Sequence, residues 1–303
     1  MPDQNARSDQ SAPDTVRRAA LQHTAKAERA LASSPLSDTD VHHARKEIKK
    51  ARAALRLLRA ALPEASYRRE DAALRRAARV LDAARDARVL VRTLDSLCRR
   101  RRPLGRDKTV LALARSLRQR QAQAQRQLKS RRAILADART MLRQVQLRGQ
   151  RWRIDGHGWS SLGPAVRRIY RAGRHAARAA RRHPDTLALH AWRKQVQYLW
   201  HALQMLRPLQ ARAHSKSGPR ARRLSDYLGE EHDLALLQST LAAQRRDKDP
   251  MNDPLPAAIE QRRRALRAKA MALGARLYAS RPRAMAAHLR RSCVRLRRSG
   301  NSK

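Results

Sequence analysis

VHHARKEIKKARAALRLLR, residues 41–59, carries two rows of side chains at helical spacing. One row is apolar and consists of Val41, Ala44, Ile48, Ala51, Leu55 and Leu58. The second row lies one residue further along and is cationic: His42, Arg45, Lys49, Arg52, Arg56 and Arg59. One residue advances about 100° around a helix, so the cations flank the buried face, whereas an ordinary surface helix places its charges opposite that face. The pattern predicts a helix whose basic row lines a groove between helices.

A second stretch, residues 189–207, reads LHAWRKQVQYLWHALQMLR and repeats this spacing. His, Arg and Lys stand at corresponding places in both stretches, and two leucines and an arginine follow in register. The recurrence predicts an internal duplication that yields two helical bundles. The second row is weaker because cations give way to Gln197, Trp200 and Gln204. The aromatic side chains here are expected to pack against neighbouring helices.

The composition favours closely packed helices. Of the 303 residues, 42% are hydrophobic but only 3% are aromatic, and Phe is absent. Small, unbranched side chains favour helices over sheets, and no segment shows the alternation of a strand. We therefore predict an all-α fold. The formal net charge of +45 requires polyanionic partners or counter-ions.

Proline and glycine divide the chain into expected elements. We expect helices at 15–33, 40–61, 66–98, 107–147 (with a break near 129–132), 165–182, 185–207, 217–245, 255–279 and 281–298. Residues 1–14 and 299–303 are predicted to be disordered tails. The glycine-rich segment 148–164 is predicted to link a first helical half, 15–147, to a second, 165–298. Ser37, Asp38 and Asp40 are candidate caps for the helix that carries the basic row.

The basic row points to a linear phosphate chain as its ligand. Its members recur every ~5 Å along the helix axis, comparable to the spacing of phosphates in a chain. Arg binds phosphate oxygens through its planar fork, and protonated His donates to them. The candidate binding residues are His42, Arg45, Lys46, Lys49, Lys50, Arg52 and Arg56. The second stretch is expected to close the groove from the opposite side with His190, Arg193 and Lys194.

Acidic residues are scarce near these cations, and we expect them to have structural roles. Asp86 and Asp233 are predicted to orient an arginine or cap a helical turn. Glu231, His232 and Asp233 are consecutive, so a helix directs them to different sides and they cannot converge on one metal ion.

Signatures of catalysis and of metal or nucleotide binding are absent from the sequence. It lacks the Walker A, zinc-protease, nucleophile-elbow and dinucleotide-binding patterns. Cys98 and Cys293 have no zinc-site spacing and predict no disulfide. No apolar run reaches the roughly 18 residues of a membrane span, and the N-terminal residues lack an apolar leader. We expect a soluble cytoplasmic protein that has no catalytic residues, metal or cofactor.

These motifs resemble the CHAD domain, the conserved histidine α-helical domain. The resemblance rests on the duplicated His-x-x-Arg-Lys helix and on the later LDAARD and LGEEHD elements, and it covers roughly residues 10–300. It implies two tandem four-helix bundles related by pseudo-twofold symmetry, with a basic surface or channel between them that binds inorganic polyphosphate. It also implies targeting to polyphosphate granules. The Glu-x-Glu-x-Lys signature of the CYTH triphosphatase domain is absent, so we expect a stand-alone CHAD domain.

The leading hypothesis is therefore non-catalytic binding of inorganic polyphosphate or another polyanion. One alternative is a nucleic-acid-binding or nucleoid protein, which the charge permits. Base-reading elements and aromatic stacking residues are scarce, which disfavours this alternative. A second alternative is an accessory subunit of an enzyme that processes polyphosphate. Chain-length preference and oligomeric state do not follow from the sequence.

Overall fold

The computed structural model describes residues 4–156, 158–209, 216–244 and 254–294. Within these ranges it is all-α and contains no strand, which confirms the predicted fold class. The first half contains α1 (Gln4–Ala32), α2 (Asp38–Leu57), α3 (Glu64–Arg79), α4 (Asp82–Arg100), α5 (Lys108–Ser130) and α6 (Arg132–Gln150). The second half contains α7 (Gly158–Arg182), α8 (Thr186–Leu206), α9 (Ser217–Gln244), α10 (Pro254–Leu277) and α11 (Pro282–Val294). Short 3₁₀ turns follow α2, α4 and α8 at Leu58–Ala60, Arg102–Arg106 and Arg207–Leu209.

The N-terminus of α2 is fixed by its own sequence. Ser37 is the N-cap, and its hydroxyl accepts a hydrogen bond from the backbone N–H of Asp40 at 3.1 Å. The Asp40 carboxylate in turn accepts from the backbone N–H of Ser37 at 2.9 Å. This reciprocal pair satisfies two backbone donors at the helix start. The cap fixes the residue at which α2 begins.

Three boundaries differ from the sequence predictions. Helix α1 begins at Gln4, so most of the segment 1–14 is helical and not disordered. The single helix expected at 66–98 is two helices, because α3 ends at Arg79 and α4 starts afresh at Asp82. The connection between the halves is shorter than 148–164, since α6 continues to Gln150 and α7 starts at Gly158. The predicted tail at 299–303 lies outside the described residues.

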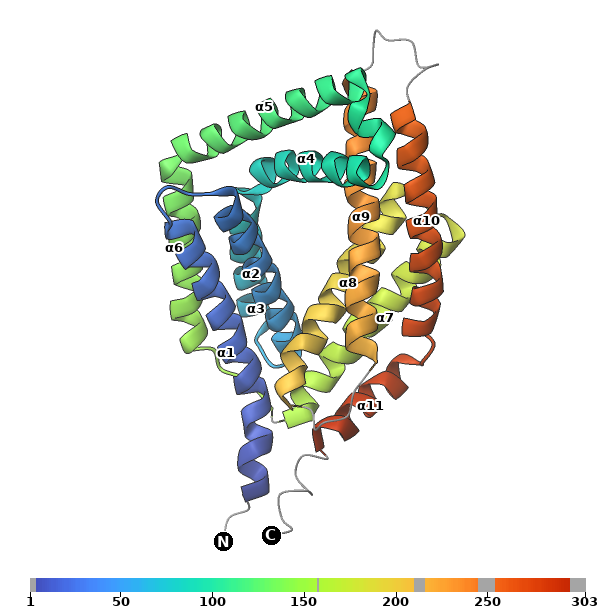
Figure 1. Cartoon of the computed structure of the whole chain (residues 1–303). Helices are drawn as coiled ribbons and strands as arrows, with labels where there is room; N and C mark the ends of the chain where they lie inside the picture. Colours follow the sequence, from blue (N-terminus) through green and yellow to red (C-terminus); the bar gives the residue numbers. More distant parts are fainter. Residues whose placement is uncertain (1–3, 157, 210–215, 245–253, 295–303) are drawn as a thin grey trace, which may run out of the picture.

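The break between α3 and α4 has a packing cause, because neither Pro nor Gly lies near it. Leu81 at the break is fully buried in the larger hydrophobic core. Helix α3 packs against α6, whereas α4 packs against α5 and α9. The chain therefore turns at Leu81, and α4 runs across the upper part of the molecule, below α5 (Figure 1). The break near residues 129–132 agrees with the prediction, since α5 ends at Ser130 and α6 starts at Arg132.

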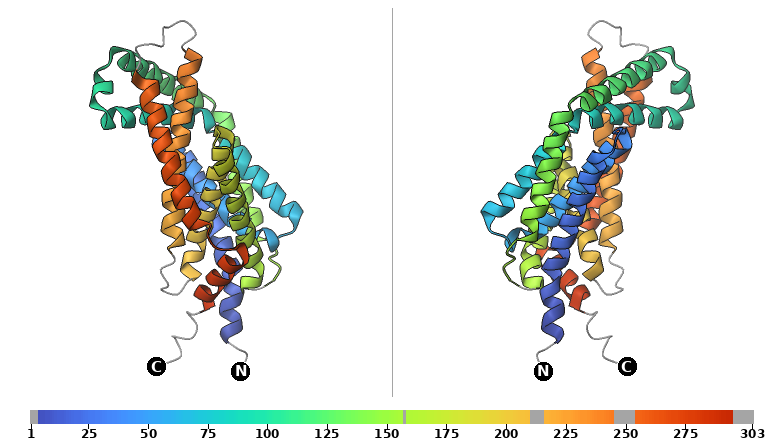
Figure 2. Two further views of the ribbon diagram at one scale, coloured as in Figure 1. Left: turned by 90° about the vertical axis from the view of Figure 1, so that its right-hand side faces the viewer. Right: turned by 90° about the vertical axis from the view of Figure 1, so that its left-hand side faces the viewer.

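Each hydrophobic core joins helices from both halves of the sequence. The larger core contains Ile48 and Leu55 of α2 together with Trp192 and Val196 of α8. The smaller core joins α4 and α5 to α9 and α10 at the upper end of the molecule. Figures 1 and 2 show α1, α2, α3 and α6 gathered beside α7, α8, α9 and α10. Helix α4 extends from the first group to α9 in the second group. The halves are therefore held as one body around α2, α4 and α8.

No helix in the described ranges is long and apolar enough to cross a membrane.

Candidate functional site

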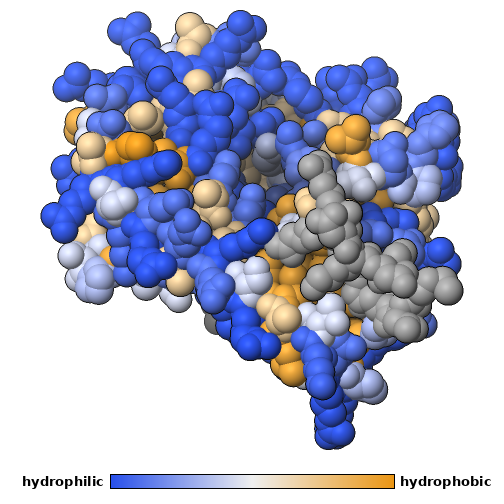
Figure 3. Space-filling view, turned by 90° about the horizontal axis from the view of Figure 1, so that it is seen from above, coloured by the Kyte–Doolittle hydropathy of each residue, from blue (hydrophilic) through white to orange (hydrophobic). Residues whose placement is uncertain are grey.

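A cavity of about 590 Å³ lies between α2, α4, α8 and α9. Its lining includes ten Lys and Arg side chains and four carboxylates, so the walls carry an excess of positive charge. Hydrophilic residues also cover most of the face that contains the α4–α5 end (Figure 3). Low-dielectric walls of one charge sign concentrate the field inside a cavity and attract ions of the opposite sign.

Four cations from three helices are grouped in this cavity. Arg45 and Lys49 come from α2, Arg85 from α4 and Arg193 from α8. We call these four residues the cation cluster. Arg193 is buried, with 9% of its surface exposed, and its Nε atom has no hydrogen-bond partner within the described part of the chain. A buried guanidinium without a partner is costly, so the cluster is suited to an anionic ligand.

Two of the four cations are paired with carboxylates. Arg45 donates to the carboxylate of Asp82 and, at 2.9 Å, to the backbone carbonyl of Ala78. Arg85 donates to Asp86 at 2.6 Å and to Asp233 at 3.3 Å. The sequence prediction that Asp86 and Asp233 orient an arginine is confirmed. Neither Lys49 nor Arg193 forms an ion pair with any described residue.

The electrostatic environment weakens the charge on the unpaired members of the cluster. Burial, followed by the nearby charges of Arg193 and Arg45, lowers the pKa of Lys49 to about 7. Burial also lowers the pKa of Arg193. The pKa of Asp233 is raised because burial outweighs its attraction to Arg193 and Arg85. An anion placed among these groups would restore the full charge of Lys49.

His42 and Lys46 line the outer part of the same cavity, where both are exposed. Partial burial of the ring and the charges of Arg88 and Arg92 on α4 lower the pKa of His42, which favours its neutral form. Arg88 donates to the backbone carbonyl of Asp38 and so ties α4 to the start of α2. A bound phosphate would favour protonation of His42, which would then donate to it.

A second cavity, of about 700 Å³, lies between α2 and α3. It shares Arg45 and Lys49 with the first cavity, so these two side chains lie where the cavities meet. Arg52 lines only the second cavity, and its Nε donates to Asp71 at 2.9 Å. The predicted basic row is therefore divided between two cavities by the curvature of the α2 surface.

Two predicted residues of α2 line neither cavity because other side chains hold them. The Nζ atom of Lys50 lies 2.6 Å from the carboxylate of Glu47, which also contacts His23 of α1 at 2.5 Å. The guanidinium of Arg56 lies 3.9 Å from the ring centroid of Tyr198 on α8. These contacts join α2 to α1 and α8, and they orient both cations away from the cluster.

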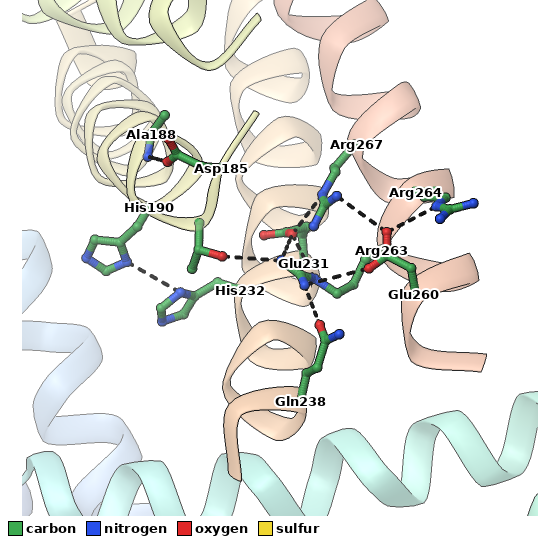
Figure 4. A network of polar contacts seen from close by, with 11 residues as sticks. Asp185, Ala188, His190, Glu231, His232, Gln238, Glu260, Arg263, Arg264 and Arg267 are labelled. Carbon is green, nitrogen blue, oxygen red and sulfur yellow. Dashed lines mark hydrogen bonds and ion pairs between the residues drawn. The ribbon is translucent and has the colours of Figure 1, made fainter. Parts of the chain in front are cut away.

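Two predicted residues of α8 also lie outside the two cavities. Nδ1 of His190 lies 3.4 Å from Nδ1 of His232 on α9, as Figure 4 shows. Burial and the charge of Arg193 lower the pKa of His232 to about 3, so this histidine is neutral. Lys194, which directly follows Arg193, is exposed to solvent. Of the three predicted residues on α8, only Arg193 lines the cavity.

The consecutive residues Glu231, His232 and Asp233 diverge as the sequence analysis predicted. Glu231 is 2% exposed and accepts from Arg263 of α10 at 2.8 Å (Figure 4). His232 faces α8, whereas Asp233 faces Arg85 of α4. No group of three His, Cys, Asp or Glu side chains suited to a metal ion occurs in the described ranges. The three residues instead fix α9 against three different helices.

The α4 wall of the cavity was missed by sequence reasoning. Arg85, Arg88 and Arg92 all line the cavity from one face of α4. Their spacing of three and four residues places them on one side of a helix, and this spacing is visible in the sequence. The sequence analysis expected one continuous helix at 66–98, and such a helix would not place these arginines in the groove. Only the turn at Leu81 brings α4 across it.

The fold and this cavity together define an all-α protein with a cation-lined groove between its helices. The chain belongs to the CHAD domain family, whose family model matches residues 15–242. No curated protein matches the chain. Among solved structures, it resembles PptA from Streptomyces chartreusis, with 15% identity and a TM-score of 0.60 over 91% of this chain and 99% of that one. It also resembles the CHAD domain from the plant Ricinus communis, with 21% identity and a TM-score of 0.50 over 93% of this chain and 92% of that one.

Proposed function

We propose that this chain binds inorganic polyphosphate, without catalysis, in the cavity between α2, α4 and α8. The observation that supports this most strongly is the buried, unpaired guanidinium of Arg193 beside the unpaired ammonium of Lys49. A chain of phosphates would neutralise both groups and would also reach Arg45 and Arg85. Membership of the CHAD family supports polyphosphate as the polyanion, because the resemblance seen in the sequence implies that ligand.

The carboxylates around the cluster also favour binding over hydrolysis. Asp82, Asp86 and Asp233 each contact an arginine, so they serve as counter-ions within the groove. Phosphoryl transfer needs carboxylates that are available to hold Mg²⁺. We expect no phosphate release when the purified protein is incubated with polyphosphate and Mg²⁺ or Mn²⁺. Release that depends on the metal and on protein concentration would contradict this part of the proposal.

Binding to long-chain polyphosphate and to duplex DNA of equal total charge, at about 0.15 M salt, tests the proposal. We expect tighter binding to polyphosphate and a steep fall in affinity as salt increases. The double variant Lys49→Met, Arg193→Met should lose most of this affinity. The matched control Lys129→Met, Arg126→Met removes the same charge from the exposed surface of α5 and should bind nearly as well as the unmodified protein. Equal affinity for DNA, or equal loss in both variants, would contradict the proposal.

We further propose that this binding recruits the chain to polyphosphate granules in the cytoplasm. A granule presents many phosphate chains, so weak individual contacts add up to stable retention. Purified polyphosphate granules should sediment together with the unmodified protein and not with the Lys49→Met, Arg193→Met variant. Equal sedimentation of both proteins would contradict recruitment through the groove.

A further inference from the structure

Helix α7 carries a second row of cations on its outer surface. The row consists of six arginines, of which all but Arg174 are exposed: Arg167, Arg171, Arg174, Arg178, Arg181 and Arg182. At about 100° per residue, all six lie within an arc of roughly 100° on the helix surface. They extend over ~22 Å along the axis. We call this set the α7 row.

The α7 row is separate from the two cavities and lacks counter-ions. No residue of α7 lines either cavity. Helix α7 contains no Asp or Glu, and neither does α11, which packs against it. None of the six arginines forms a hydrogen bond or ion pair with a described residue.

Some exposed arginines on other helices are paired with an acidic residue of their own helix. Arg68 of α3 contacts Glu64 at 2.8 Å, and Arg264 of α10 contacts Glu260 at 3.1 Å. Both pairs join residues four apart on one helix, which is the usual way to offset a surface charge. Because α7 has no such acidic residue, its arginines repel one another and stay available to an external anion.

The chemistry of the row defines its partner as a phosphate chain without base recognition. Tyr170, the aromatic residue that precedes Arg171 in α7, is buried and donates its hydroxyl to the carbonyl of Leu277 at 2.9 Å. It is therefore not available to stack on a nucleobase, which is what non-specific single-strand binding requires. The row presents only guanidinium groups at helical spacing, and these suit a bare chain of phosphates.

We infer that the α7 row is a second binding surface for polyphosphate, so that one protein molecule can bridge two chains or two segments of one long chain. This inference rests on the proposed function, because it assigns the same ligand to a second surface. The groove holds a segment among buried cations, whereas the α7 row holds another by exposed contacts that salt screens more strongly. Two surfaces on one molecule convert binding into cross-linking.

Light scattering on mixing the protein with long-chain polyphosphate, paired with tripolyphosphate binding at about 0.15 M salt, tests the inference. The row variant replaces four arginines by glutamine: Arg167→Gln, Arg171→Gln, Arg174→Gln and Arg178→Gln. The matched control removes the same charge from α5, the start of α6 and the residue between them: Arg115→Gln, Arg126→Gln, Arg131→Gln and Arg132→Gln. A third variant with lysine at the four row positions keeps the charge and checks that the helix still folds.

We expect the row variant to lose cross-linking and to bind tripolyphosphate as the unmodified protein does. The slope of log affinity against log salt for long chains should shrink by about 0.7 for each phosphate that the row no longer neutralises. The control and the lysine variant should still cross-link. Cross-linking by the row variant, or equal loss in the control, would overturn the inference. So would a row variant that loses only duplex DNA binding, because the row would then belong to nucleic acid.

The same measurements separate this inference from the proposed function. The proposed function fails if the Lys49→Met, Arg193→Met variant binds tripolyphosphate normally. The bridging inference fails if scattering is unchanged in the row variant while tripolyphosphate binding still depends on Lys49.

Discussion

At the scale of single residues, the charge of Lys49 has opposite effects on the stability of the free protein and on ligand binding. Its ammonium is partly buried beside Arg193 and Arg45, and its pKa is lowered to about 7. The folded state without ligand is therefore destabilised by this group in its charged form. A polyphosphate chain would reverse the effect by supplying negative charge where the cations converge. A residue that is unfavourable for the free protein and favourable for its complex is typical of a binding site.

Replacing Lys49 by methionine should stabilise the free protein and weaken its binding. Methionine keeps the length of the side chain and removes the charge. We expect the melting temperature at pH 7 to rise, and affinity for tripolyphosphate to fall by at least about tenfold, the value of one charged hydrogen bond. Calorimetry and binding titration measure the two effects. Lys129→Met, on the exposed end of α5, is the control and should change neither quantity. A lower melting temperature in Lys49→Met would show that its charge is compensated in the free protein.

The same residue makes binding depend on pH. The pKa of Lys49 is about 7 in the free protein and rises when an anion binds, so binding takes up a proton between pH 7 and the higher pKa of the complex. Affinity should be highest at or below pH 7 and fall above it, by up to about tenfold per pH unit. Lys49→Arg stays charged and should flatten the profile between pH 7 and 9. If that variant keeps the same slope, a different group titrates.

The carboxylate of Asp233 should compete with the ligand for the cations of the cluster. Its carboxylate contacts Arg85 at 3.3 Å and attracts Arg193 and Lys49, which holds the cluster together in the free protein. Asp233→Asn should therefore increase the affinity for tripolyphosphate. Because burial raises the pKa of Asp233 and so disfavours its charged form, this change should not lower the melting temperature. Asp86→Asn, which removes a more exposed partner of Arg85, should have the smaller effect on affinity. Weaker ligand binding by Asp233→Asn would show that Asp233 positions the arginines for the ligand.

At the scale of elements, the position of α9 depends on one buried ion pair. Glu231 is 2% exposed and accepts from Arg263 and Arg267 of α10 at 2.8 and 3.1 Å. These contacts set the rotation of α9, so that His232 faces α8 and Asp233 faces α4. Figure 4 shows this network between α9 and α10, with His232 directed away from it toward His190 of α8.

Breaking this pair should cost much more than breaking its exposed neighbour. Glu231→Gln removes the carboxylate that Arg263 and Arg267 contact most closely and leaves them only the longer contacts to Glu260, at 3.8 and 3.6 Å. It should lower the free energy of unfolding by about 3 kcal/mol. Glu260→Gln removes a carboxylate that is 30% exposed and should cost about 1 kcal/mol or less. Urea unfolding measures both values. Similar losses in the two variants would mean that Glu231 is not the contact that fixes α9.

The elements also show how far the sequence could lead. Helical period and capping residues predicted the α-helical class, Ser37 as one of three candidate caps of α2, and the break near residues 129–132, because local chemistry determines those features. The turn at Leu81 was not predicted, because it depends on packing of α3 and α4 against different helices. Without that turn, Arg85, Arg88 and Arg92 could not be assigned to the groove. Lys50 and Arg56 were assigned to the groove because spacing does not reveal partners such as Glu47 and Tyr198.

At the scale of the whole molecule, the two sequence halves meet around the groove. Both hydrophobic cores contain helices from each half, so α2 and α8 are held against one another by their own apolar faces. Of the cationic side chains beside those faces, His42, Arg45, Lys46 and Lys49 of α2 and Arg193 of α8 line the first cavity. The internal duplication stays a prediction from the recurrence of the His-x-x-Arg-Lys pattern in residues 41–59 and 189–207. The net charge of +45 makes the whole molecule attractive to polyanions, and the groove adds a place where cations are buried and unpaired.

A crystal structure of the protein with tripolyphosphate tests the central claim most directly. We predict phosphate density between α2, α4 and α8, in contact with Arg45, Lys49 and Arg193. Phosphates found only on exposed arginines, with this cavity free of ligand, would contradict the account.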